Sequence, residues 1–237
     1  MFSADRDYPP VLFRDRVEAG KKLAQKVREL ALENAVILTI PAGGVPVAAQ
    51  IARALGAPMD LMIARKIQFP WTTEAGFGAV VSDGTVYLGP HSANLPKAVI
   101  EAQMEKARRE VEHRMKEFRG DRKPIDLLGK DVILVDDGLA TGSTMLAAVQ
   151  SVRKQRPRQV IVAVPTASGS AVKMLKPHVD VLISLYIHPE YLPFAVASAY
   201  EHWYDLSDEE VKRYLMEMSQ TASKNSTQEH NLLGKPG

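Results

Sequence analysis

Short apolar runs alternate with segments of helical spacing along most of this chain. The apolar runs predict buried strands at residues 35–40, 60–64, 132–136, 159–165 and 179–185. Apolar side chains spaced three and four residues apart predict helices at 13–31, 45–56, 95–119, 144–154, 168–175 and 208–218. Two of these helices have the spacing of a capping box near their start, in Asp15 with Glu18 and in Ser207 with Glu210. Because strands and helices alternate, we predict an α/β fold with a mainly parallel central sheet and helices on both faces.

Residues 67–90 interrupt this alternation. The sequence FGAVVSDGTVYLG at 77–89 contains two β-prone runs around Ser-Asp-Gly, which is typical of a hairpin. The residues before it, IQFPWTTEAG at 67–76, have the composition of an exposed loop. We therefore predict a loop and a hairpin that project from the strand–helix pattern.

The composition limits the classes of protein that need to be considered. The 237 residues include 30 basic and 28 acidic side chains, and this near balance disfavours a protein that coats nucleic acid. The helix predicted at 95–119 likewise carries mixed charges. The absence of cysteine excludes disulfides and thiolate zinc sites. No apolar run approaches the roughly 20 residues that cross a bilayer, and the first ten residues lack the apolar core of a secretory signal, so we expect a cytoplasmic protein.

The stretch VILVDDGLATGST, residues 132–144, carries the clearest chemical signal. A predicted buried strand ends on Asp136 and Asp137, and small and hydroxyl residues fill the connection to the next helix, namely Ala140, Thr141, Gly142, Ser143 and Thr144. Small residues let backbone N–H groups approach an anion, and a helix N-terminus adds positive potential. A carboxylate pair can accept hydrogen bonds from the vicinal hydroxyls of a sugar, with hydrated magnesium nearby. The stretch therefore predicts a site for a 5-phosphoribosyl group.

Other motifs differ from this stretch in spacing. A Walker loop would require a lysine that is absent here. The separation of Gly138 and Gly142 is not that of a dinucleotide fingerprint. An aspartyl-phosphate site would have two aspartates separated by one residue. The remaining alternative is an acidic turn that only caps a helix.

The stretch resembles the phosphoribosyl-pyrophosphate (PRPP) motif of the type I phosphoribosyltransferases, in which a buried strand leads to two acids and a Thr-Gly loop. The resemblance extends to a family of predicted phosphoribosyltransferases. It rests on FRDRVEAGKKLA, PAGGVPVAAQIA, ARK followed by EAGFGAV, and LSDEEVKRYL, and it spans roughly residues 13–215. It implies the type I fold, with a lid hairpin and a small hood.

The resemblance also implies residue roles in binding the donor. Asp136 and Asp137 would hold the ribose hydroxyls, and residues 140–144 would hold the 5-phosphate. Magnesium would be bound through PRPP and water near the two aspartates, without direct protein ligands. The donor would be PRPP, and the partner substrate would be a small nitrogenous acceptor.

The matching residues for the pyrophosphate are Ala42, Gly43 and Gly44, which would form its loop, with Arg65 and Lys66 meeting its charge. A non-proline cis peptide is expected in this loop, between Ala42 and Gly43. Family members often have arginine where this chain has Ala42, so one cation is missing. Either Arg65, Lys66 and magnesium compensate for it or turnover is slow.

The resemblance also divides the chain into functional parts. Residues 1–218 would form one domain, with a lid at about 67–90 and a hood built from the N-terminal segment and from about 186–218. Trp71 and Glu74 are lid candidates for stacking and for proton transfer. The tail at 219–237 is polar and rich in turn residues, which predicts disorder.

The implied activity is magnesium-dependent transfer of a 5-phosphoribosyl group from PRPP to a nitrogenous acceptor, such as a nucleobase, with release of pyrophosphate. Such an enzyme needs no nucleophilic side chain, because groups aimed at the leaving pyrophosphate stabilise the separating charge. Two alternatives stay open, a non-catalytic sensor of phosphoribosyl compounds or nucleotides and a hydrolase of phosphoribosyl compounds. A homodimer is compatible with the sequence, and nucleic-acid binding is not favoured.

Overall fold

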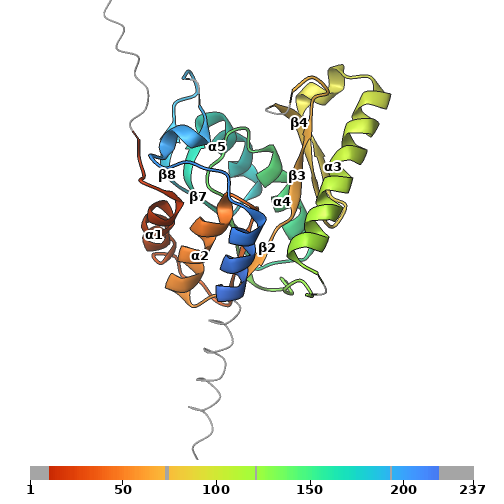
Figure 1. The fold of residues 1–237 in the computed structure, drawn as a ribbon. Coiled ribbons are helices and arrows are strands. Elements are labelled where there is room, and N and C mark those ends of the chain that lie inside the picture. The colour runs from red at the N-terminus through yellow and green to blue at the C-terminus, as the bar shows by residue number, and fades with distance from the viewer. Residues whose placement is uncertain (1–10, 73–74, 121, 193, 219–237) are drawn as a thin grey trace, which may run out of the picture.

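The computed structural model describes residues 11–72, 75–120, 122–192 and 194–218. A five-stranded parallel sheet has the order β2-β1-β6-β7-β8 (Figure 1). Its strands are β1 (Ala35–Thr39), β2 (Met59–Leu61), β6 (Asp131–Val135), β7 (Gln159–Ser168) and β8 (Val181–His188). The predicted parallel sheet is thus confirmed. The strand order changes direction between β1 and β6, and ligands of open α/β sheets bind beyond the carboxyl ends of the strands at such a point.

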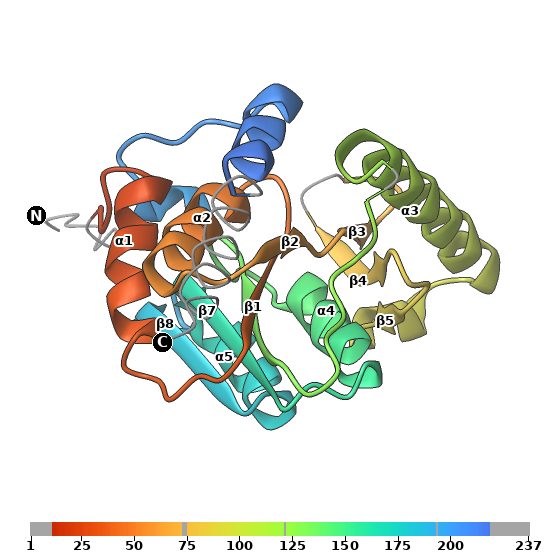
Figure 2. The ribbon, with the colours of Figure 1, turned by 90° about the horizontal axis from the view of Figure 1, so that it is seen from below.

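Helices cover both faces of this sheet, as predicted (Figure 2). One face packs against α1 (Arg16–Val27) and α2 (Gly44–Leu55). The other face packs against α4 (Ser143–Lys154) and α5 (Gly169–Leu175), and α5 continues into the short η2 (Lys176–His178). Alternate residues of each strand point to opposite faces, so the near-continuous apolar strands serve two cores at once.

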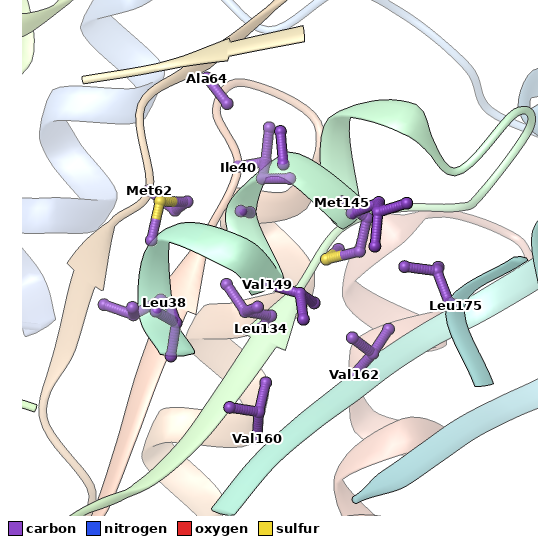
Figure 3. Close-up of a cluster of buried hydrophobic side chains, with 14 of the residues drawn as sticks. Leu38, Ile40, Met62, Ala64, Leu134, Met145, Val149, Val160, Val162 and Leu175 are labelled. Carbon is purple, nitrogen blue, oxygen red and sulfur yellow. The ribbon is translucent and has the colours of Figure 1, made fainter. Parts of the chain in front are cut away.

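Figure 3 shows one of these two cores, which lies between α4 and the sheet. Leu134 and Val162 lie on neighbouring strands, and Met145 and Val149 of α4 pack over them. All four side chains are at most 1% exposed. Burying a side chain of this size contributes about 1.5–3 kcal/mol relative to leaving it in water. This packing fixes the start of α4, and with it the connection from β6 to α4.

A second, antiparallel sheet has the order β3-β4-β5 and lies beside the central one (Figures 1 and 2). Its strands are β3 (Ala64–Gln68), β4 (Gly76–Val81) and β5 (Val86–Leu88). The hairpin predicted around Ser-Asp-Gly is the β4–β5 turn. The short η1 (Pro90–Asn94) follows, and then α3 (Lys97–Phe118) packs on this sheet.

The single strand predicted at 60–64 is wrong, because the chain divides there into β2 and β3. The loop predicted from residue 67 also begins later, since β3 continues to Gln68 and pairs with β4. Ile63 and Ile67 are at most 1% exposed and pack with the apolar face of α3. Their burial holds β3 in the second sheet. The sequence of β3 did not predict this strand, because charged residues interrupt its apolar positions.

The segment before α1 contacts the segment before the C-terminal helix. The backbone N–H of Phe13 donates to the carbonyl of Ala199, the last residue of η3 (Val196–Ala199), at 3.0 Å.

A capping box of Ser207 with Glu210 starts a helix at residues 208–218, with bonds of 2.9 and 3.2 Å. The Asp15 side chain caps α1 by accepting from the Glu18 N–H at 2.8 Å. Both predicted caps are confirmed.

Among the residues that the structure describes, no helix is both long enough and apolar enough to cross a bilayer. The tail predicted at 219–237 lies outside the described residues.

Candidate active site

The glycine loop after β1 and the acid pair after β6 are in direct contact. A Cβ atom added to Gly43 would lie 2.0 Å from Oδ2 of Asp137. One added to Gly44 would lie 2.9 Å from the Cα atom of Asp136 and 2.6 Å from Oγ1 of Thr39. Both residues therefore have to be glycine for the two loops to approach this closely. The contact lies where the strand order reverses, between β1 and β6.

The two aspartates have different surroundings. Oδ2 of the buried Asp137 accepts a hydrogen bond from Nε of Arg16 at 2.8 Å. Oδ1 of Asp136 accepts from the Asp137 backbone N–H at 2.9 Å, and the residue as a whole is half-buried. Burial and the neighbouring charge of Asp137 hold the pKa of Asp136 well above its usual range. Burial also raises the pKa of Asp137, and the Arg16 guanidinium opposes that rise.

The hydroxyl loop runs from β6 to α4. Gly142 has a φ of 76°, and α4 begins at the next residue. The first N–H groups of a helix have no intrahelical partner, so Ser143 and Thr144 present donors there. Ala140 and Thr141 are exposed, which leaves the loop open to a ligand. Free donors at a helix N-terminus can bind an anion.

Ser168 fixes this loop from the end of β7. Its hydroxyl donates to the Ala140 carbonyl at 2.6 Å and accepts from the Ala171 N–H at 3.1 Å, which caps α5. A bridge between Leu139 and Ala167 adds a second link between the segments. No sequence pattern pointed to Ser168, because its partner Ala140 lies on a different element.

We predict that Ser168→Ala destabilises the protein by about 1 kcal/mol, as expected for loss of an N-cap. The freed Ala140 carbonyl also loosens the loop, so affinity for inorganic phosphate or PRPP falls several-fold. Thermal unfolding and calorimetric titration measure the two effects. Ser170→Ala removes a neighbouring hydroxyl that contacts Ser168 but not the loop, and it should preserve both values. Unchanged affinity in Ser168→Ala would show that the loop does not need this support.

The structure does not bring Arg65 and Lys66 to one side. They are consecutive on β3, opposite Val80 and Ala79, so their side chains point to opposite faces of the sheet. Nε of Arg65 lies 3.8 Å from Oε2 of Glu110 on α3, and burial together with the charge of Arg114 lowers the pKa of Arg65. The Lys66 side chain instead lies against Gly76, whose added Cβ would be 2.4 Å from its Cγ.

The loop that joins β3 to β4 carries a stacked aromatic pair, of which only Trp71 is exposed. Trp71 is 71% exposed and stacks on Phe69, with ring centroids 5.1 Å apart and an interplanar angle of 22°. Phe69 in turn contacts Phe77 of β4 at 5.4 Å. Glu74, the other lid candidate, lies outside the described residues.

The predicted position of the cis peptide is wrong by one bond, since it joins Pro41 to Ala42. Gly43, at the predicted position, already has helical backbone angles as the N-cap of α2. Ala42 is partly buried and packs against the cluster that α3 shares with β3 and β4.

Arg16 is the main residue of the site that the sequence pattern did not reveal. A charged residue at the start of an amphipathic helix is normally solvated, but this one is 5% exposed and bonded to Asp137. Its only signal was its place within FRDRVEAGKKLA, one of the segments that carry the family resemblance.

Comparisons with known proteins bear on these features. A model of the phosphoribosyl transferase domain matches residues 14–190. Proteins of two Mycobacterium tuberculosis strains, each described as a phosphoribosyl transferase, are 36% identical over 207 residues, which cover 86% of this chain. The chain spans only 46% of the length of these relatives. The uracil phosphoribosyltransferase of Mycoplasma genitalium is 34% identical over 67 residues, 27% of this chain and 32% of that one.

A solved structure is also similar to most of this chain. The protein TT1426 from Thermus thermophilus is 36% identical and superposes with a TM-score of 0.71. The match covers 87% of this chain and 99% of that one. The resemblance to phosphoribosyltransferases drawn from the sequence motifs is thereby confirmed, and the chain belongs to the family of transferases with a phosphoribosyl transferase domain.

Proposed function

We propose that this chain transfers the 5-phosphoribosyl group of PRPP to a nitrogenous acceptor and releases pyrophosphate. One observation carries the proposal, namely the direct contact of the glycine loop 42–44 with the pair Asp136–Asp137. PRPP consists of a pyrophosphate, a ribose and a phosphate in series. We assign the pyrophosphate to the glycine loop, the ribose to the acid pair and the 5-phosphate to the hydroxyl loop 140–144.

In this proposal the acid pair and the hydroxyl loop hold the sugar phosphate. The carboxylates of Asp136 and Asp137 accept hydrogen bonds from the ribose hydroxyls. The hydroxyl loop binds the 5-phosphate through first-turn N–H groups of α4 and the side chains of Thr141, Ser143 and Thr144. The exposure of Thr141 and the left-handed conformation of Gly142 support this role.

The leaving pyrophosphate is assigned to the loop of Ala42, Gly43 and Gly44. Arg65 and Lys66 are assigned to its charge, and because Arg65 faces Glu110 of α3 in the described conformation, its side chain has to turn toward the loop when the donor binds. We assign the lid to residues 67–90, with Trp71 and Glu74 as its candidates. The hood comprises the N-terminal segment and residues 186–218, in a single domain of residues 1–218.

The chemistry follows from how charge separates. The bond from ribose C1 to pyrophosphate breaks, and a bond from C1 to the acceptor nitrogen forms, after which that nitrogen loses its proton. Positive charge develops on the sugar and negative charge on the departing pyrophosphate. Donors fixed in advance around the pyrophosphate stabilise this separation, and a closed lid excludes the water that would hydrolyse the donor.

Magnesium fits this arrangement as a companion of the donor. The described residues contain no group of three or more histidine or acidic side chains suited to hold an ion. Mg²⁺ commonly keeps several waters and binds through substrate phosphates. The partly exposed Asp136 is the side chain that bound water would reach. When present, the ion neutralises part of the pyrophosphate charge.

The test is a screen of nucleobases, including uracil, with PRPP and magnesium, in which pyrophosphate release is measured. We expect release that depends on one acceptor and is lost in the double variant Asp136→Asn/Asp137→Asn. Ribose 5-phosphate released without an acceptor would identify a hydrolase instead. PRPP binding without turnover of any acceptor would favour a sensor. A cytoplasmic location and a homodimer also belong to the proposal, and fractionation and light scattering test them.

A further inference from the structure

Arg16 is a buried cation at the junction of three segments. Its side chain is 6% exposed, although it is the first residue of α1. Nε donates to Oδ2 of Asp137 at 2.8 Å, and Nη1 donates to the backbone carbonyl of Tyr204 at 2.7 Å. A buried guanidinium without such partners would be costly, so these two bonds define its position.

The segment at residues 199–206 encloses this guanidinium. The Trp203 ring lies over it, with 3.9 Å from the Arg16 Cζ atom to the ring centroid, and the Tyr200 ring lies at 5.9 Å. The Tyr200 hydroxyl also donates to the backbone carbonyl of Asp137 at 2.6 Å. Segment 199–206 is therefore attached to Asp137 twice, once through Arg16 and once through Tyr200.

Arg16 also changes the charge of the acid pair. Two adjacent carboxylates repel each other and would repel a ligand with several phosphate groups. The guanidinium balances the charge of Asp137 and fixes its carboxylate in one orientation. The partly exposed Asp136 is then the acid of the pair with room for a ligand.

We propose that Arg16 is a positioning residue of the donor site, which orients Asp137 for a phosphorylated sugar and couples ligand binding there to segment 199–206. This inference rests on the proposed function, because it assigns PRPP to the acid pair. It adds to that function a link between the donor site and a segment that the sequence places far from it.

The test compares Arg16→Met, Arg16→Lys and a matched control. Arg53→Met removes another arginine that anchors the C-terminal helix, through Glu217 at 2.7 Å, away from the acid pair. We expect Arg16→Met to weaken PRPP binding by about tenfold to a hundredfold, the effect of losing a charged hydrogen bond. Arg16→Lys should recover part of the affinity because it keeps the charge beside Asp137. Arg53→Met should bind PRPP normally.

Two further measurements separate positioning from simple stabilisation. Trp203 fluorescence, taken as the difference between wild type and Trp203→Phe, should change when PRPP binds. This change in Trp203 fluorescence should vanish in Arg16→Met at saturating PRPP. It should also vanish in Arg16→Lys, because lysine lacks the second planar donor that bonds to the Tyr204 carbonyl. In an Asp137→Asn background, Arg16→Met should cause no additional loss of affinity. Thermal unfolding of every variant shows which ones are folded under the conditions of the titration.

The outcomes distinguish this inference from the proposed function. Normal PRPP affinity in a folded Arg16→Met variant would overturn the role of Arg16 and leave the function intact. A loss equal to that of Arg53→Met, or one fully additive with Asp137→Asn, would also overturn it. If the wild-type protein binds no PRPP, the proposed function fails, and the role of Arg16 at a donor site fails with it.

Discussion

Gly43→Ala should abolish PRPP binding and sharply reduce stability. The new methyl group would lie 2.0 Å from Oδ2 and 2.6 Å from Cγ of Asp137, far inside van der Waals contact. The carboxylate cannot retreat easily, because Arg16 holds its Oδ2 atom at 2.8 Å. Either the buried ion pair breaks or the glycine loop moves away from β6. We expect a loss on the order of 3 kcal/mol in the free energy of unfolding, from overpacking and a damaged buried ion pair.

Thermal unfolding and calorimetric titration with PRPP and magnesium measure the two effects of Gly43→Ala. Gly89→Ala is the matched control, since its added Cβ has no neighbour closer than 3.3 Å and its φ is −78°. It should change stability by less than about 1 kcal/mol and leave binding intact. A Gly43→Ala protein with wild-type stability and affinity would mean that the loop and the acid pair are not in contact in solution.

The segments of the proposed donor site could be picked out from the sequence because their signals are local. Strand β6, the two acids and the small-residue loop are contiguous, so one short stretch indicates burial, carboxylates and a helix start together. Gly43 and Gly44 likewise follow directly on an apolar run. Their contact with Asp136 and Asp137 depends on the parallel pairing of β1 with β6, which the fold class predicts only in outline.

The remaining features depend on tertiary contacts that no periodicity encodes. Arg16 is buried because segment 199–206 folds back over it, and nothing local to α1 indicates that cover. The division between β2 and β3 was missed for a related reason. The sequence ARKIQ has no apolar run, yet Ile67 becomes fully buried once α3 packs on the second sheet.

The acid pair lowers the stability of the free protein. The pKa of Asp136 is raised by burial and by the charge of Asp137, so the native state holds this proton more tightly than the unfolded chain does. Stability from this group is therefore fully present below the unfolded pKa of about 4 and is lost as pH rises through the folded pKa. Above the unfolded pKa, therefore, this group lowers the stability of the free protein, and in the proposed function the ribose hydroxyls and magnesium offset that cost.

Asp136→Asn should consequently stabilise the free protein at pH 8 and weaken its binding of PRPP. The amide keeps an oxygen to accept from the Asp137 N–H but carries no charge, so the repulsion disappears. A gain on the order of 1 kcal/mol would raise the Tm by about 2–4 °C, and the gain should shrink as the pH falls toward 4. PRPP affinity should fall by about tenfold to a hundredfold, because the ribose hydroxyls lose a charged acceptor.

Unfolding scans between pH 4 and pH 8 and titration with PRPP test both halves of the Asp136→Asn prediction. Asp126→Asn, at an exposed loop position where Oδ1 accepts from the Leu128 N–H, is the control and should change neither quantity. A variant that is less stable than wild type at pH 8 would contradict the raised pKa of Asp136. A more stable variant that still binds PRPP normally would confirm the repulsion but remove Asp136 from the sugar site, leaving Asp137 and the hydroxyl loop to hold the donor. The two measurements together therefore decide whether the cost in stability is linked to ligand binding.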